Sequence, residues 1–581
     1  MKSGKEIEEI IHKYTLKNAI EHDGKARAGT VLGKIISEKP ELKKNLKQIG
    51  ELVEKITNDL NKLSVTQQRK ILEEKWPELL YEEKKVEEKK LPPLPNSNKY
   101  DKIVTRFSPN PDCVLHLGSI RALILSHDYA RIYNGKFLLR FEDTDPRLKK
   151  SVLEFYDLIR DDIEWLGCKW DEEYIQSDRI PIYYEYAKKI IDIGGAYVCT
   201  CESSDFKQKI INKKSCDCRE MQSSEHAKRW QKMLEGNYKE GEAIIRIKTE
   251  LDHPNPAVRD WPALRIIDTT KYPHQRVGSK YNVWPLYNFA CGIDDHLLGI
   301  THIIRGKEHF TNMVRQKYLY KYFEWEYPEA IHYGRLKIPD ATLSKSQIMK
   351  DLEEGVIQDF SDPRVATLIA MKRRGINPET LRKIVIDIGP RPVDVTLSWE
   401  NIYAINRKLV DQETNRYFFI SDPIQLCIKG VLKNISSRIP LHPDHLERGY
   451  REFEVQPEKN IARLYVSKGD IDLLKEKNII RLMELFNLQI ESIKDNSIVA
   501  TFKGTSYTDV KKARIPIIHW LPDKGNIDTE VIMPNAKVVK GLAESSLKNE
   551  KIKNTVQLMR FGFGRIDSFE NRLLRIYFSH S

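Results

Sequence analysis

The sequence lacks long apolar runs and contains few cysteines. No stretch approaches the ~18 consecutive apolar residues of a membrane-spanning helix. The first residues, MKSGKEIEEIIHKY, are charged where a secretory signal would be apolar. Eight cysteines among 581 residues are too sparse for a disulfide framework. We therefore expect a cytoplasmic protein that does not contact a membrane.

A glycine-rich phosphate loop is also missing where one would be expected. Residues 109–119, PNPDCVLHLGS, follow a β-branched run and precede a segment with helical spacing. Strand-to-helix turns of this kind hold phosphates in α/β enzymes. This turn offers His116, whose imidazole can hydrogen-bond phosphate oxygens, and Gly118, which lets a nucleotide approach closely. A turn histidine that only packs is the alternative.

Charge of both signs is plentiful, with a positive excess. Lys and Arg number 96 against 84 acidic residues, a net charge of +12. A basic balance favours a polyanionic partner through counterion release, although a charged surface that aids solubility explains it equally well. A length of 581 residues predicts about four domains.

Composition shifts predict where the chain divides. Apolar residues at spacings of three and four predict helices up to about residue 80, and the prolines of LPPLP then predict a stiff linker, so residues 1–90 form a helical appendage. Solvated helix faces explain its charge runs better than docking of an unknown protein does.

Strands alternating with amphipathic segments predict a parallel α/β sheet over 100–195. Short alternating strands after 420 predict antiparallel barrels or sandwiches.

A second polar motif lies far downstream of the first, in DATLSKSQIMK at residues 340–350. Ser344, Lys345 and Ser346 place one ammonium between two hydroxyls on a loop before a helix. Such a loop can close over a polyphosphate and stabilise the charge of a leaving pyrophosphate. An ordinary solvated lysine loop is the alternative.

The two motifs together resemble the signatures of class I aminoacyl-tRNA synthetases, HIGH and KMSKS. The longer set RFSPNP, RFEDTDP, YNFA and IIRGKEH is similar to glutamyl-tRNA synthetases of the archaeal and eukaryotic type, as is the C-terminal IIHWLP, VKGLAE and VQLMRFGFGRID. The resemblance runs from about residue 100 to the end. Two departures are Ser119, in place of the second histidine of HIGH, and Thr342–Leu343, in place of the first two residues of KMSKS.

The resemblance implies a multidomain fold. A Rossmann-like α/β catalytic domain would be split by an inserted acceptor-binding domain and followed by a helical connector that carries the Ser-Lys-Ser loop, and C-terminal β-barrels would bind the anticodon. The implied limits are 100–195 and 281–340 for the catalytic halves, 196–280 for the insertion, 341–420 for the connector and 421–581 for the β-barrels.

The implied reaction is the ATP-dependent attachment of L-glutamate to tRNA(Glu) through glutamyl-adenylate, with Mg²⁺ on the phosphates. Whether tRNA(Gln) is charged as well stays open. His116 and Lys345 would be catalytic. The ATP-binding residues would be His116, Gly118, Ser119, Ser344 and Lys345.

A glutamate pocket must hold two carboxylates and one ammonium. The resemblance places Arg106 and Arg305 at the side-chain carboxylate, which a guanidinium binds bidentately. It places Glu142 at the α-ammonium, and Ser108 and Tyr287 would add hydrogen bonds. A plain Arg106–Glu142 ion pair across neighbouring strands is the alternative.

No substrate contact is expected from Cys291, which stands where bacterial relatives often carry asparagine, and Asp145 is expected to order its turn.

Four further readings stay open. A glutaminyl-tRNA synthetase shares the architecture, but a second buried guanidinium would lie unpaired in a glutamine pocket, so Arg305 favours glutamate. A truncated relative that glutamylates a tRNA base would lack the β-rich C-terminus. Another kind of nucleotidyltransferase needs no Ser-Lys-Ser loop, and a silent RNA-binding scaffold needs neither His116 nor Lys345.

Four cysteines lie in two close pairs, YVCTCE and SCDCRE. Cys199, Cys201, Cys216 and Cys218 can supply four thiolates in tetrahedral geometry, and related enzymes carry zinc in a similar site. A structural Zn²⁺ would stabilise a loop that lacks its own core, and four reduced thiols are the alternative. Cys113, Cys168 and Cys427 are isolated and are expected to be packing residues.

Overall fold

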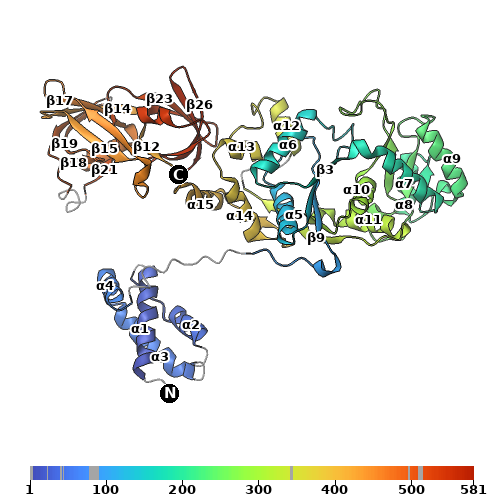
Figure 1. Ribbon diagram of the computed structural model, residues 1–581, viewed down its shortest axis with the longest axis horizontal. Coiled ribbons are helices and arrows are strands. Elements are labelled where there is room, and N and C mark those ends of the chain that lie inside the picture. Colours follow the sequence, from blue (N-terminus) through green and yellow to red (C-terminus); the bar gives the residue numbers. More distant parts are fainter. Residues whose placement is uncertain are drawn as a thin grey trace. The chain divides into compact units, whose positions relative to one another are not determined.

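The computed structural model divides the chain into two compact units, residues 1–89 and 90–581 (Figure 1). It describes residues 4–22, 24–39, 42, 45–76, 90–339, 345–494, 497–507 and 515–581. Among the helices of these residues, none is both long and apolar enough to cross a membrane.

The N-terminal unit is built from helices, as the apolar spacing predicts. They are α1 (Gly4–Glu21), α2 (Ala28–Glu38), α3 (Leu46–Leu60) and α4 (Val65–Lys75). Helix α4 begins with a capping box, in which the Ser64 hydroxyl accepts from the Gln67 backbone and the Gln67 side chain accepts from the Ser64 backbone. Buried side chains such as Leu16, Ile35 and Val53 give this unit a core of its own.

A parallel sheet begins the second unit, as predicted over 100–195. Strands β1 (Val104–Phe107), β2 (Lys136–Phe141) and β3 (Glu172–Ile175) pair in that order, and β8 (His302–Gly306) pairs in parallel with β9 (Glu329–Tyr333). The Thr301 backbone N–H donates to the Val104 carbonyl at 3.0 Å, which joins the edges of β1 and β8. The carboxyl ends of β1, β2 and β8 therefore lie at one edge, where α/β sheets bind ligands.

Helices connect these strands and pack on the sheet. They are α5 (Ile120–Ile132), α6 (Leu153–Trp165), α7 (Ile180–Asp192), α10 (Tyr287–Leu297) and α11 (Phe310–Tyr322). The apolar residues of β1 and β2 share one core with α5 and α6, which includes Phe107, Leu123, Leu139 and Ile159. Strands buried in this way read as continuous apolar runs, which is why KFLLRF was recognisable from the sequence.

An antiparallel sheet interrupts the parallel one. It pairs β4 (Ala196–Cys199), β5 (Ile244–Ile247), β6 (Pro262–Ile266) and β7 (Val283–Pro285) in chain order, and α8 (Ser203–Ile211) and α9 (Ser223–Leu234) lie between β4 and β5 in the chain. Strand β7 belongs to this sheet although it lies beyond the limit of 280 drawn from the sequence. Three residues carry no periodic signal, so only the pairing of β7 with β6 reveals the strand.

A helical segment follows, with α12 (Lys345–Glu353), α13 (Leu368–Arg373), α14 (Pro378–Ile388) and α15 (Trp399–Val410). A short parallel pair joins β10 (Leu336–Lys337), which precedes this segment, to β11 (Val395–Thr396), which lies between α14 and α15.

Two seven-stranded sheets form the C-terminal part, coloured orange to red in Figure 1. The first runs β12 (Arg416–Tyr417), β25 (Thr555–Leu558), β26 (Gly562–Glu570), β27 (Leu573–His580), β23 (Ile527–Ile532), β24 (Val538–Ala543), β13 (Phe419–Ser421). The second runs β21 (Ile517–Ile518), β18 (Ile479–Leu482), β19 (Asn487–Lys494), β20 (Ser497–Phe502), β14 (Pro423–Lys429), β17 (Ile461–Ser467), β22 (Leu521–Pro522). Strands β15 (Ile435–Pro440) and β16 (Tyr450–Val455) form a separate hairpin, and α16 (Ile471–Glu476) follows β17.

The antiparallel pairing predicted here holds for most neighbouring strands of both large sheets, but each sheet also contains two parallel pairs. Strand β14 pairs in parallel with β20, β18 with β21, β12 with β25 and β23 with β27. Each parallel pair joins strands that are separated by intervening elements, which supply the long crossover that a parallel pair requires.

Candidate active site

A cavity of about 650 Å³ opens at the carboxyl ends of the parallel strands. It is lined by all five side chains predicted to bind the amino acid: Arg106, Ser108, Glu142, Tyr287 and Arg305. These residues come from separate elements. Arg106 is on β1 and Ser108 follows that strand, Glu142 follows β2, Tyr287 begins α10, and Arg305 is on β8.

Arg305 is a buried cation in this cavity with unused donors. Only 5% of the residue is exposed. Its Nη2 donates to Gln316 Oε1 at 3.2 Å and to the Tyr327 hydroxyl at 3.0 Å, both neutral groups. Its Nε and Nη1 are buried without a hydrogen-bond partner among the described residues. A buried charge left this way is costly, so the arrangement favours an anionic ligand that supplies the missing acceptors.

Arg106, by contrast, is already paired. Its Nε donates to Asp295 Oδ1 at 2.7 Å and its Nη2 to Asp295 Oδ2 at 3.0 Å. Asp295 Oδ1 also accepts from Arg140 Nη1 at 2.7 Å. Against the effect of burial, the two guanidiniums hold the pKa of Asp295 well below its usual range. The alternative pairing of Arg106 with Glu142 is wrong, because Asp295 takes both of these donors.

Glu142 is oriented by two donors on a single oxygen. Arg140 Nη2 donates to Glu142 Oε1 at 3.0 Å, and the Cys291 thiol donates to the same oxygen at 2.9 Å. Burial raises the pKa of Cys291 well above its usual value, so the thiol keeps its proton and can donate. Cys291 therefore takes part in the site through Glu142, a role that the sequence did not suggest.

The charges of this inner wall leave one positive excess. Together with the ion pairs behind it, this wall holds four guanidiniums and three carboxylates: Arg106, Arg140, Arg179 and Arg305 against Glu142, Asp294 and Asp295. A ligand with one net negative charge would neutralise the wall, provided that it carries a cation for Glu142 and an anion for Arg305.

His116 lies in the turn before α5 as a neutral donor. Its Nδ1 accepts from the Gly118 N–H at 3.0 Å, which leaves the ring proton on Nε2. Burial, together with the nearby Lys345 ammonium, lowers its pKa to about 4. A Cβ at Gly118 would lie 2.6 Å from His116 Cε1, so the glycine is needed for this ring position. Ser119 directly precedes α5 at its N-cap and donates its N–H to the His116 carbonyl at 2.8 Å.

The structure brings the second motif to the first. Lys345 begins α12, and its Nζ lies 2.8 Å from Asp112 Oδ1 and 3.4 Å from the Asn110 carbonyl. Asn110 also lines the amino-acid cavity. Lys345 thus contacts the turn 109–119, which contains His116, although it lies more than 200 residues further along the chain. Ser344, Thr342 and Leu343 lie outside the described residues.

Sequence reasoning missed Asp295 and Arg140, which orient Arg106 and Glu142. A signal for Asp295 was present, since the acidic pair in GIDDHL interrupts an apolar helix, and a charge on a buried face needs a partner. The sequence does not reveal the partners of Asp295, because they depend on where α10 lies relative to β1 and β2 in the folded chain.

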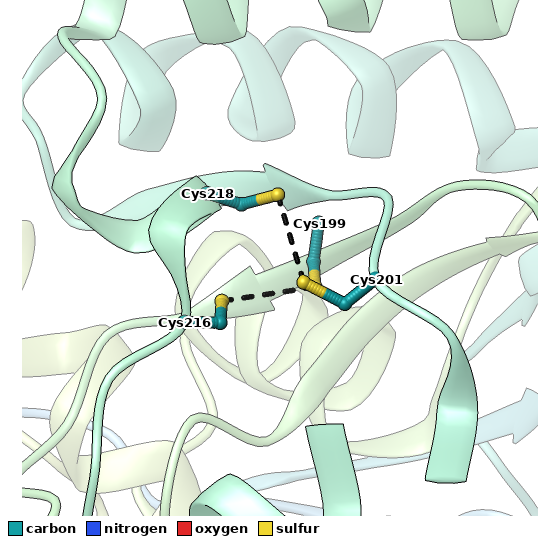
Figure 2. A group of neighbouring side chains, drawn as sticks. All are labelled: Cys199, Cys201, Cys216 and Cys218. Carbon is teal, nitrogen blue, oxygen red and sulfur yellow. Dashed lines mark hydrogen bonds between the residues drawn. The ribbon is translucent and has the colours of Figure 1, made fainter. Parts of the chain in front are cut away.

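The four paired cysteines form one cluster in the antiparallel insertion. Their sulfur atoms all lie within 4.8 Å of one another, and Figure 2 shows the thiols pointing toward a common centre. Cys199 and Cys216 are 3.9 Å apart, and Cys201 and Cys218 are 3.8 Å apart. The hydrogen bond from Cys199 lowers the pKa of Cys216 to about 5, which favours a thiolate. Four convergent sulfurs are the donor set of a structural zinc site.

Three family models match the chain. The catalytic-domain model of class I tRNA synthetases (E and Q) matches residues 102–412, more than half of the sequence, and anticodon-binding models of the same class match 414–506 and 517–567. The chain is a class I tRNA synthetase of this group. The two anticodon-binding matches together cover most strands of the two seven-stranded sheets, and each sheet takes strands from both matched ranges.

Curated relatives narrow the group further. The chain is 50% identical over 579 residues to a glutamate–tRNA ligase of Pyrococcus furiosus, covering 98% of this chain and 99% of the relative. Glutamate–tRNA ligases of Thermococcus kodakarensis and Thermococcus onnurineus are 48% and 47% identical, each over 99% of this chain and 100% of the relative. This tRNA synthetase therefore belongs with the glutamate–tRNA ligases, and the glutaminyl alternative is not favoured.

Proposed function

We propose that this synthetase joins L-glutamate to the 3′ end of tRNA(Glu) in two ATP-dependent steps. The α-carboxylate of glutamate attacks the α-phosphorus of ATP, so that glutamyl-adenylate forms and pyrophosphate leaves. The terminal ribose hydroxyl of the tRNA then attacks the acyl carbon and displaces AMP. The protein aligns the reactants and stabilises charge, without forming a covalent bond to them.

The unsatisfied Arg305 guanidinium is the observation that carries this proposal. Glutamate has one net negative charge, which matches the positive excess of the cavity wall. Its side-chain carboxylate would accept from Arg305 Nε and Nη1, the two donors left without partners. Glutamine would put a neutral amide there and leave the buried charge uncompensated.

The other cavity residues fit the remaining groups of glutamate. Glu142 would receive the α-ammonium, since its Oε1 is already held by Arg140 and Cys291. Ser108 lines the cavity, and its buried hydroxyl has no partner among the described residues, so it is available to the substrate. Tyr287 would add a hydroxyl at the side-chain carboxylate, beside the paired Arg106.

ATP would bind at the turn 109–119. The neutral His116 would donate its Nε2 proton to a phosphate oxygen, while Gly118 and Ser119 border the start of α5. Lys345 would exchange Asp112 for the phosphates and stabilise the leaving pyrophosphate, with Ser344 beside it. Mg²⁺ would accompany the phosphates of ATP.

The remaining predictions complete the functional picture. Zn²⁺ held by Cys199, Cys201, Cys216 and Cys218 would stabilise the insertion, and this insertion would bind the acceptor end of the tRNA.

The two C-terminal sheets, which follow a Rossmann-like catalytic domain in the chain, would act as β-barrels that contact the anticodon. The enzyme would work in the cytoplasm. Whether it also charges tRNA(Gln), and whether residues 1–90 bind another protein, stays open.

ATP–pyrophosphate exchange in the presence of tRNA tests the glutamate assignment. Arg305→Cys should depress exchange with glutamate at least a hundredfold, because removing one partner from a buried charged contact costs about 3 kcal/mol or more. Arg131→Cys is the control, since this residue pairs with Asp171 on the surface at 2.8 Å, away from the cavity. Nearly intact exchange in Arg305→Cys would overturn the role of Arg305.

A further inference from the structure

Three contacts join the segment that carries Glu142 to the insertion. His274 Nε2 lies 2.9 Å from the Asp143 carbonyl. Arg265 Nη2, on β6, lies 2.9 Å from Asp145 Oδ2. Arg147 pairs with Glu240, which lies between α9 and β5. The end of β2 therefore depends on the insertion for part of its position.

His274 makes the most buried of these contacts. Its residue is 2% exposed, and its ring packs 5.3 Å from that of Trp284. The N–H groups of Arg276 and Val277 approach its Nδ1 at 3.2 and 3.4 Å, so Nδ1 accepts and the proton lies on Nε2. Nε2 therefore donates to the Asp143 carbonyl. Burial lowers the pKa of His274, so the ring is neutral when it does so.

The Asp143 side chain is fixed by groups outside the insertion, Ser177 in the turn after β3 and Tyr156 on α6. Its Oδ1 accepts from the Ser177 N–H at 2.8 Å, and its Oδ2 accepts from the Ser177 and Tyr156 hydroxyls, each at 2.6 Å. With its carboxylate held by these groups and its carbonyl by His274, Asp143 has little freedom to rotate. Because Glu142 directly precedes Asp143 in the chain, the backbone of Glu142 is restricted as well.

We propose that His274 is a positioning residue for glutamate binding, which acts through the Asp143 carbonyl on the carboxylate of Glu142. This role rests on the proposed function. Without the hydrogen bond, the peptide between Asp143 and Thr144 can rotate, and Glu142 leaves the position that Arg140 and Cys291 define. A displacement of about 1 Å is enough to weaken a charged contact with a ligand. ATP, which would bind at the turn 109–119, does not depend on this contact.

Steady-state kinetics of two variants test the role. In His274→Ala, the KM for glutamate should rise about tenfold, while the KM for ATP stays within about twofold. His274→Gln places an amide N–H near the position of Nε2 and should recover most of the affinity for glutamate. His226→Ala is the control: this histidine is also buried in the insertion, but its ring accepts from the Val198 N–H at 3.3 Å, away from Glu142.

The outcomes separate the two proposals. A wild-type enzyme that does not activate glutamate would overturn the proposed function itself. With an active wild type, an unchanged KM for glutamate in His274→Ala would overturn the role of His274. Equal rises in the two KM values, or the same effect in His226→Ala, would show a general structural role and would also overturn it. If His274→Ala does not fold, the comparison of His274→Gln with wild type decides: an unchanged KM for both substrates supports the role, and a rise in both overturns it.

Discussion

Almost every charge buried in the cavity wall has a partner of opposite sign, and Arg305 is the exception. Asp295 balances Arg106 and shares Arg140 with Glu142. Among the described residues, Arg305 forms side-chain hydrogen bonds only to the neutral Gln316 and Tyr327. An unpaired buried charge lowers the free energy of unfolding, so other contacts of the folded chain must compensate for it. Binding of a carboxylate removes this destabilisation. Arg305 is thus the residue that most strongly favours a ligand with a carboxylate over a neutral one.

The thiol of Cys291 offers a sharp test at this scale. Cys291→Ala removes a donor to Glu142 Oε1 and should raise the KM for glutamate about five- to tenfold, since a hydrogen bond to a charged group contributes about 1.5 kcal/mol. Cys291→Ser keeps a donor and should stay within about threefold of wild type. Cys427→Ala, on β14, is the control. Equal values for the alanine and serine variants would contradict the assignment of Cys291.

Lys345 should matter to the chemical step far more than its neighbours on α12. Lys345→Met removes the ammonium that would stabilise pyrophosphate, and kcat for adenylate formation should fall about a hundredfold or more. Lys350→Met removes a cation from the same helix, where Nζ lies 3.6 Å from Glu354, and should leave kcat unchanged. Similar rates for the two variants, measured by single-turnover kinetics, would exclude a special role for Lys345.

The neutral state of His116 makes stability depend on pH. A folded-state pKa of about 4, below the ordinary histidine value of about 6.5, means that the unfolded chain binds the proton more readily. Stability is therefore retained above pH 6.5 and lost as the pH falls toward 4, by up to about 3 kcal/mol from this one group. His116→Gln cannot gain this proton and should lose less, as followed by thermal unfolding between pH 7 and pH 4.5. Parallel losses in both proteins would refute the assignment.

At the scale of elements, sequence patterns predicted helices and buried strands better than they predicted pairing. Apolar spacing identified α1 and α3, and the run KFLLRF identified β2, because both signals are local. The parallel pair of β14 and β20 depends on contacts between distant segments, which no local pattern contains. The same distinction holds at the site: the five residues predicted to bind the amino acid line one cavity, whereas the role of Asp295 depends on where α10 lies in the folded chain.

The insertion should depend on zinc. Protein purified without added zinc should contain about one zinc per chain, and its removal by a chelator should lower the Tm by several degrees, because the thiolates lose the ion that holds β4 and the segment around Cys216 together. Cys216→Ser should reproduce the loss of metal, and Cys427→Ser should not. A zinc content well under one equivalent would rule out the site.

At the scale of the whole molecule, the net charge of +12 predicts a strong salt dependence for tRNA. Neutralising several phosphates releases counterions, so the KM for tRNA should rise at least about tenfold between 50 and 200 mM salt. The KM for glutamate should change less than about threefold, because its contacts are buried and poorly screened. A KM for tRNA that is insensitive to salt would contradict binding through the basic surface.

Aminoacylation with each of the two amino acids, on purified tRNA(Glu) and tRNA(Gln), tests the central claim most directly. We expect glutamate to be attached to tRNA(Glu) and the same reaction to fail with glutamine, because only a carboxylate satisfies the free donors of Arg305. Attachment of glutamate to tRNA(Gln) as well would extend the tRNA range without changing the pocket. Attachment of glutamine at a comparable rate, or of neither amino acid, would contradict the account.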